Sequence, residues 1–101
     1  MKFNIYFTPT SRKTLIQLKK DPGKNKNYKA VKKAIILLSE NPRHPGLQTH
    51  IIYSIKGPSG EKVFEAYAQQ NTPSAYRIFF CYGPDKKEIT IIAIIPHPKK
   101  T

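Results

Sequence analysis

Two apolar runs near the C-terminus read Tyr76-Arg77-Ile78-Phe79-Phe80-Cys81-Tyr82 and Ile89-Thr90-Ile91-Ile92-Ala93-Ile94-Ile95-Pro96-His97. Both are rich in β-branched and aromatic residues, and the segment between them, Gly83-Pro84-Asp85-Lys86, has the composition of a turn. The pattern predicts an antiparallel hairpin. Arg77 and His97 lie in these otherwise apolar strands, and an arginine beside a histidine on a dry sheet is typical of a phosphate-binding site.

Upstream of the hairpin, two further runs have the period of two that is typical of strands. Residues 51–56 and 62–69 alternate in polarity, and the turn-forming segments Gly57-Pro58-Ser59-Gly60 and Asn71-Thr72-Pro73-Ser74 follow them. With residues 75–82 and 88–95, these runs predict a four-stranded antiparallel meander.

The N-terminal half predicts a strand followed by two helices. Residues 3–8 alternate as a half-buried strand does, Thr8-Pro9 is a helix-start signal, and Asp21-Pro22-Gly23 ends this helix near Lys20. Asn27 is the expected N-cap of the second helix, which Asn41-Pro42 ends. The apolar face of that helix recurs at spacings of three and four, at Tyr28, Val31, Ile35 and Leu38.

We therefore predict a single α+β domain over residues 1–101, in two layers. An N-terminal strand and two helices pack on the antiparallel β-meander. The expected core contains Leu15, Leu18, Val31, Ile35, Leu38, Ile78 and Phe80.

Strand parity assigns side chains to the two faces of the sheet. If Ile78, Phe80 and Tyr82 face the helices, Arg77, Phe79 and Cys81 face the other way. The same rule puts Glu65 and Tyr67 on the face of Arg77. On the last strand it groups His97 with Ile95, Ala93 and Ile91.

The charge of the chain is strongly positive. Eighteen Lys and Arg residues against six Asp and Glu give a formal net charge of +12, which attracts nucleic acid or an acidic protein. The single cysteine, Cys81, excludes an internal disulfide and a CxxC metal site. This cysteine usage fits a reducing, cytoplasmic setting. No apolar stretch reaches the roughly 18 residues of a membrane span, so we expect no membrane association.

Short motifs along nearly the whole chain resemble the RelE/ParE superfamily of toxins from bacterial toxin–antitoxin pairs. They are Leu37-Leu38-Ser39-Glu40-Asn41-Pro42, Gly46-Leu47-Gln48, Phe64-Glu65-Ala66-Tyr67, Tyr76-Arg77-Ile78-Phe79-Phe80 and the C-terminal histidine. RelE-, YoeB- and HigB-like members cut messenger RNA in the ribosomal A site: the ribose 2′-hydroxyl attacks the adjacent phosphate and leaves a 2′,3′-cyclic phosphate. ParE-like members share the fold but poison gyrase.

The resemblance implies roles for individual residues. Arg77 matches the arginine that stabilises the phosphate in the nucleases, and His97 matches the position of the YoeB-like histidine acid. Glu65 is the third candidate catalytic residue, either as general base or as the ion-pair partner that orients Arg77, and His44 is the other candidate base. Tyr67, His44 and Arg43 are expected to bind substrate. This chemistry requires no metal and no cofactor.

The sequence also departs from the family pattern. Pro45-Gly46-Leu47 occupies the stretch where YoeB-like members carry a glutamate base, and Pro98 follows the histidine where they have a tyrosine. Glu65 and Tyr67 stand where RelE-like members have two lysines. Two hypotheses therefore remain: a ribosome-dependent endoribonuclease, or a non-nuclease binding module that is either a ParE-like gyrase inhibitor or a catalytically degenerate toxin relative.

Lysines concentrate in one part of the chain, where they account for seven of the fifteen residues from 19 to 33. In the family, a basic surface meets ribosomal RNA or an acidic antitoxin protein. We expect Lys29, Lys32 and Lys33 to contact ribosomal RNA. The expected assembly is a monomer or a toxin–antitoxin hetero-oligomer.

Overall fold

The computed structural model describes residues 2–70, 72 and 74–97. Its elements are β1 (Asn4–Phe7), α1 (Pro9–Lys20), η1 (Pro22–Lys24), α2 (Asn25–Glu40), η2 (Pro45–Leu47), β2 (His50–Lys56), β3 (Lys62–Tyr67), β4 (Tyr76–Tyr82) and β5 (Glu88–Pro96). Within this part of the chain the strands form one sheet in the order β1-β5-β4-β3-β2. Strands β2 to β5 are the predicted antiparallel meander, and β1 joins the far edge parallel to β5.

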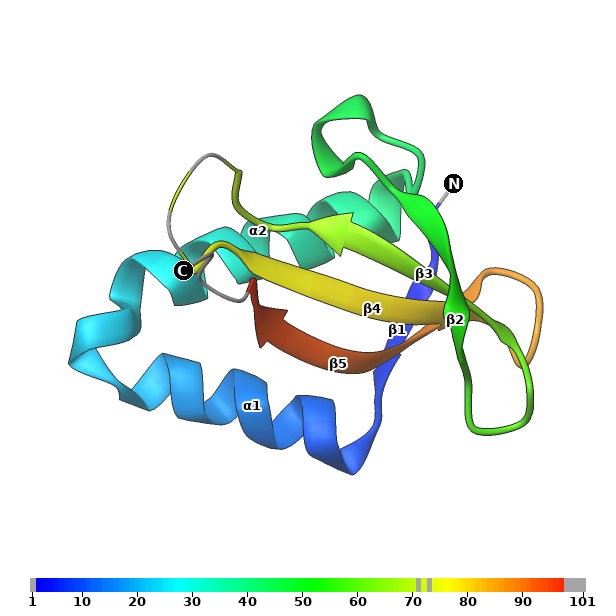
Figure 1. The fold of residues 1–101 in the computed structure, drawn as a ribbon, viewed down its shortest axis with the longest axis horizontal. Helices are drawn as coiled ribbons and strands as arrows, with labels where there is room; N and C mark the ends of the chain where they lie inside the picture. Colours follow the sequence, from blue (N-terminus) through cyan, green and yellow to red (C-terminus); the bar gives the residue numbers. More distant parts are fainter. Residues whose placement is uncertain (1, 71, 73, 98–101) are drawn as a thin grey trace.

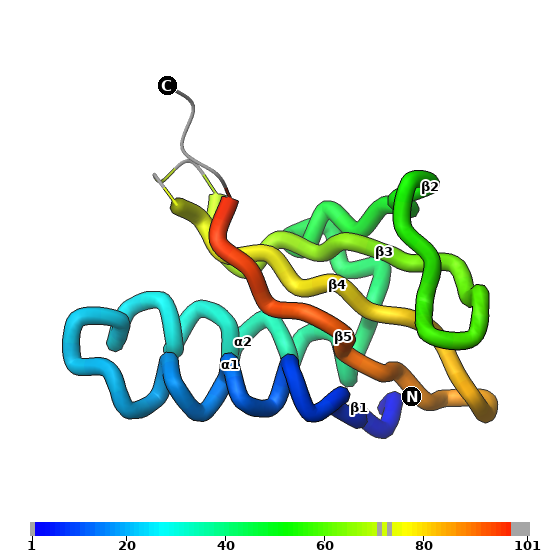
Figure 2. The backbone as a smooth tube through the Cα atoms, turned by 60° about the horizontal axis from the view of Figure 1, so that its bottom comes forward, coloured from blue at the N-terminus to red at the C-terminus, as the bar shows by residue number. Residues whose placement is uncertain are grey.

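Both helices cover the same face of the sheet, as the two-layer prediction required. Figure 1 shows α1 and α2 running side by side, and Figure 2 shows them as a layer beneath the strands. The opposite face of the sheet carries no helix in the described residues. None of the helices in this part of the chain is long and apolar enough to cross a membrane.

Helix α1 begins as its sequence predicts. The Thr8 side chain accepts a hydrogen bond from the Ser11 N–H, and Pro9 occupies the first helical position, where no N–H is needed. Ser11 is itself fully buried, and its hydroxyl donates to the carbonyl of Ile91 at 2.7 Å. This buried hydrogen bond fixes the start of α1 against β5.

Helix α2 begins at Asn25, so the prediction that Asn27 caps it was wrong. Pro22–Lys24 forms a 3₁₀ turn that leads directly into α2, which places Asn27 inside the first helical turn. The Asn27 amide instead donates to Oε1 of Gln69 at 3.0 Å, and the same oxygen accepts from the Tyr76 N–H. Asn27 therefore links α2 to Gln69, which follows β3, and through Gln69 to Tyr76 at the start of β4.

The predicted core is confirmed. Leu18, Val31, Leu38, Ile78 and Phe80 are buried, and Leu15 and Ile35 are partly buried against them. A smaller apolar cluster on the uncovered face contains Val63, Phe79 and Cys81. Tyr82 stays 38% exposed, although its ring contacts that of Phe80 with centroids 5.5 Å apart.

A bulge in β5 overturns one parity assignment. Phe79 pairs with Ala93 and Phe80 pairs with Ile91, which leaves Ile92 as an extra residue. Ile91 therefore belongs to the helix-covered core, whereas Ala93 packs with the cluster on the other face. The prediction that Ile91 shares the face of His97 was wrong because one inserted residue reverses the alternation.

Candidate functional site

Glu65 on β3 lies between two basic side chains on the neighbouring strands. Its Oε2 accepts a hydrogen bond from Nη1 of Arg77 on β4, and its Oε1 lies 2.8 Å from Nε2 of His50 on β2. The Glu65 side chain is only 4% exposed. A buried carboxylate of this kind is tolerated because charged donors compensate for the lost water. We call these three residues the Glu65 cluster.

The His50 ring is held between two acceptors. Its Nδ1 lies 2.9 Å from the backbone carbonyl oxygen of Gln48, while its Nε2 faces the Glu65 carboxylate. Only the doubly protonated imidazolium can donate to both acceptors at once. The His50 side chain is 45% exposed, so the Glu65 cluster reaches the surface at this ring.

Arg77 lies against an aromatic surface on the face that the helices leave uncovered. Its guanidinium carbon lies 5.4 Å from the centroid of the Phe79 ring, and its Nε is buried without a hydrogen-bond partner among the described residues. Tyr67 pairs with Arg77 in register and contacts the His50 ring edge to face at 5.9 Å. Glu65, Tyr67 and Arg77 thus share one face, as strand parity predicted.

His97 follows β5 at the same end of the sheet as Arg77. Its backbone N–H donates to the carbonyl of Ala75 at 2.7 Å, and Ile95, two residues earlier, pairs with Arg77. The residue is exposed. Its role as an acid stays a prediction.

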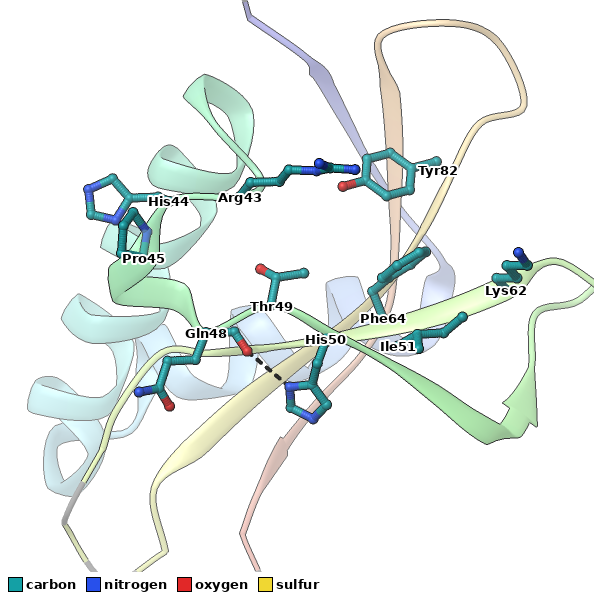
Figure 3. Close-up of a pocket in the computed structure, with 10 residues that line it drawn as sticks. All are labelled: Arg43, His44, Pro45, Gln48, Thr49, His50, Ile51, Lys62, Phe64 and Tyr82. Atoms are coloured by element: carbon teal, nitrogen blue, oxygen red, sulfur yellow. Dashed lines mark hydrogen bonds between the residues drawn. The ribbon is translucent and has the colours of Figure 1, made fainter.

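The predicted substrate-binding residues come together only in pairs. Arg43 and His44 follow α2 and line a cleft with Tyr82, as Figure 3 shows. His44 also lines a second hollow of about 540 Å³ between α2 and the end of β3, together with Tyr67 and Lys33. Nδ1 of His44 accepts a hydrogen bond from the Gly46 N–H at 3.0 Å, so its proton is on Nε2 when the ring is neutral.

The three lysines expected to contact RNA lie exposed on α2. Sequence reasoning missed His50 as a member of the site. The available signal was the alternation at the start of β2, which puts His50 and Ile52 on the face opposite Ile51. In the described residues, no group of three or more His, Cys, Asp or Glu side chains is placed to hold a metal ion.

Solved structures of toxins have this fold. A chain of the archaeal RelE–RelB complex from Pyrococcus horikoshii OT3 matches with a TM-score of 0.62 at 17% identity, covering 95% of this chain and 96% of that one. YoeB from Staphylococcus aureus, solved as a dimer, matches with a TM-score of 0.68 at 12% identity, covering 97% of this chain and 100% of that one.

A third match is a YoeB/ParE toxin from Agrobacterium tumefaciens, with a TM-score of 0.67 at 9% identity and coverage of 94% of this chain and 99% of that one. The sequence matches no protein-family model, and no curated protein matches it. The chain therefore has the α+β fold of the RelE and YoeB toxins, and at these identities the likeness establishes the fold alone.

Proposed function

We propose that this protein is the toxin of a toxin–antitoxin pair and acts as a ribosome-dependent endoribonuclease. The observation that carries the proposal is the Glu65 cluster, which holds Arg77 on the open face of a sheet whose fold matches toxin structures. A fixed guanidinium suits phosphate because its planar N–H groups bind the oxygens directionally.

The proposed reaction moves two protons. The 2′-hydroxyl loses its proton as its oxygen attacks the adjacent phosphorus, and the 5′-oxygen gains a proton as its bond to phosphorus breaks. Arg77 stabilises the extra negative charge of the pentavalent phosphorane, where a preorganised cation has most effect. His97 donates the proton to the leaving 5′-oxygen. The products are a 2′,3′-cyclic phosphate and a 5′-hydroxyl.

Glu65 acts in this scheme as a positioning residue. Both of its oxygens are already engaged, by Arg77 and by His50, which disfavours its use as the base. His44 is then the group that takes the 2′-hydroxyl proton, after its Nδ1 gives up the hydrogen bond from Gly46. The His50 ring contacts the other oxygen of Glu65 and so helps to fix the carboxylate that orients Arg77.

The net charge of +12 supports anionic partners. We assign Lys29, Lys32 and Lys33 to ribosomal RNA, and a second partner is an acidic antitoxin, in keeping with the RelE–RelB complex among the structural matches. The proposed assembly is a monomer on the ribosome or a hetero-oligomer with the antitoxin, and the proposed location is the cytoplasm, where ribosomes work.

One observation favours the alternative of a gyrase inhibitor or a degenerate relative. The stretch that would carry the YoeB-like glutamate contains Gly46, where an added Cβ would lie 3.1 Å from the His44 ring. Any side chain at this position would require the His44 ring to shift by a few tenths of an ångström.

Expression in a bacterial host, with separate readouts of protein synthesis and DNA supercoiling, tests the two functions against each other. The nuclease predicts arrest of translation with cut messenger RNA and unchanged supercoiling. Loss of supercoiling while messenger RNA stays intact would replace the nuclease by the gyrase inhibitor. Neither effect, from a folded protein, would favour the degenerate relative.

A further inference from the structure

A cleft of about 670 Å³ lies between the segment that follows α2 and the ends of β3 and β4. Figure 3 shows Arg43 reaching across its mouth towards Tyr82, with the Phe64 ring below and Lys62 beyond it. Its volume falls in the range of about 300–1,000 Å³ that is usual for small-ligand sites. It is separate from the face that carries Arg77, because Phe64 and Arg77 belong to opposite faces of the sheet.

Aromatic rings form the floor of this cleft. The rings of Tyr82 and Phe64 meet edge to face with centroids 5.1 Å apart, and Tyr82 also contacts Phe80 at 5.5 Å and Phe3 at 6.1 Å. These neighbours fix the orientation of the Tyr82 ring although 38% of the residue is exposed. A fixed, exposed ring is a surface on which another planar group can stack.

The rim of the cleft is basic. Arg43 and Lys62 are among its lining residues, which include no Asp or Glu. Burial raises the pKa of the Tyr82 phenol, and the positive charge of Arg43 opposes that rise. The guanidinium therefore lies close enough to the phenol to interact with it electrostatically. The segment carrying Arg43 is held in place, because the Thr49 hydroxyl donates to the Pro42 carbonyl at 2.7 Å and the Arg43 N–H donates to Oδ1 of Asn41 at 3.0 Å.

We propose that this cleft binds one nucleotide of single-stranded RNA, with its base stacked on Tyr82 and Phe64 and its phosphate beside Arg43 or Lys62. Stacking surfaces next to cations are the usual combination for unpaired nucleotides. An acidic peptide would use the cations and leave the aromatic floor unused. His50 lines the cleft and its ring also contacts Glu65, so the cleft adjoins the surface that carries Arg77 but does not include it. The bound nucleotide therefore flanks the bond that is cut.

The identity of this strand as messenger RNA rests on the proposed nuclease function, whereas the binding itself can be measured without ribosomes. The probe is a short single-stranded RNA oligonucleotide titrated into the full-length protein and followed by NMR. We expect the ring signals of Tyr82 and Phe64 to shift on binding. Arg43→Gln and Lys62→Gln should each weaken binding about fivefold or more and lower the salt slope by about one.

Matched variants separate stacking from charge. Tyr82→Phe keeps the ring and should bind as the wild type does, whereas Tyr82→Leu should weaken binding about fivefold or more. Lys13→Gln removes one charge from the exposed surface of α1, outside the cleft, and should change binding little. Thermal unfolding of each variant shows whether it folds. If Tyr82→Leu does not fold, the Arg43→Gln and Lys62→Gln variants still test whether the cleft binds RNA.

Unshifted ring signals, or wild-type binding in a folded Tyr82→Leu or in both charge variants, would overturn the inference. So would an oligoglutamate peptide that binds more tightly than the RNA with the same dependence on Arg43 and Lys62. Arg77→Ala should leave oligonucleotide binding at the cleft intact. If the cleft binds RNA but the wild type cleaves none, only the nuclease proposal is contradicted. If cleavage depends on Arg77 but the cleft binds no RNA, only this inference is contradicted.

Discussion

Glu65 and Arg77 form an ion pair between β3 and β4 in which the carboxylate is almost fully buried and the arginine side chain is 19% exposed. The pair is diagonal, because Tyr67 is the residue directly opposite Arg77 and Glu65 lies opposite Phe79. Holding Arg77 in this way restricts its rotation, so less entropy is lost when a phosphate binds to it. Glu65 therefore holds the side chains of Arg77 and His50 in fixed positions on the sheet.

Arg77→Ala should lower the single-turnover rate of RNA cleavage on programmed ribosomes by roughly a hundredfold or more, because it removes charge stabilisation from the phosphorane. Ribosome binding should stay nearly intact, since dispersed lysines provide it. The variant should also lose on the order of 3 kcal/mol of stability, because Glu65 stays buried with one partner fewer.

Arg77→Lys controls for that loss of stability, because it keeps a positive charge near Glu65 but not the planar fork. It should fold better than Arg77→Ala and still cleave slowly. Wild-type cleavage by a folded Arg77→Ala would mean that this surface does not perform the reaction.

Glu65→Gln distinguishes a positioning residue from a base. It keeps the shape of the side chain and removes its charge, so the positioning role predicts a loss of about tenfold in the cleavage rate, with Arg77 less well ordered. The Arg77 side-chain NMR signals and the single-turnover rate should be measured on the same sample. A loss of a thousandfold or so with Arg77 still ordered would make Glu65 the base.

His97→Ala should slow cleavage less than Arg77→Ala does, because water can supply the proton to the leaving 5′-oxygen. A substrate with a better leaving group needs less proton donation, so it should recover part of the lost rate in this variant but not in Arg77→Ala. Equal recovery in both variants would argue against His97 as the acid.

Combined neutralisation of Lys29, Lys32 and Lys33 should reduce the salt dependence of ribosome binding. The slope of log K against log salt should shrink by about one for each phosphate contact that is lost. The matched control neutralises Lys13, Lys86 and Lys87, which are exposed elsewhere and change the net charge equally. Equal effects of the two triple variants would assign the α2 lysines to general attraction rather than to specific contacts.

Cys81 provides a prediction about pH. Burial raises the pKa of its thiol, with a smaller contribution from Glu61, so the folded state disfavours the thiolate. Its stabilising contribution is complete below the thiol pKa of the unfolded chain, near 8.5, and decreases as the pH rises above that value towards the folded pKa. Cys81→Ala should therefore lose less stability between neutral and alkaline pH than the wild type does, as measured by denaturant titration.

The same cysteine should react slowly with thiol reagents until the protein unfolds, because it is 3% exposed. Gly57→Ala should destabilise the fold, since the added Cβ would lie 2.8 Å from Sγ of Cys81 and 2.6 Å from the Glu61 carboxylate. Rapid labelling of Cys81 in the native wild type would contradict this account of its burial.

Local sequence signals were sufficient for most of the fold. Thr8-Pro9 and Asn41-Pro42 mark helix ends through contacts with near neighbours in the chain, and the alternation in β3 and β4 places Glu65, Tyr67 and Arg77 on one face. These features depend on residues a few positions apart, so they can be read from the order of amino acids. The start of α2 was misplaced, because a 3₁₀ turn from Pro22 made a cap at Asn27 unnecessary.

Features that depend on contacts between distant residues required the fold. The bulge at Ile92 reverses the alternation within β5, and no residue near it in the sequence signals the insertion. The parallel pairing of β1 with β5 closes one edge of the sheet across the whole length of the chain. His50 becomes part of the site only because the register of β2 places it opposite Glu65, fifteen positions away. The cleft of Arg43 and Tyr82 likewise arises where separate segments meet, which is why charge and periodicity alone indicated a basic α+β domain but not the cleft itself.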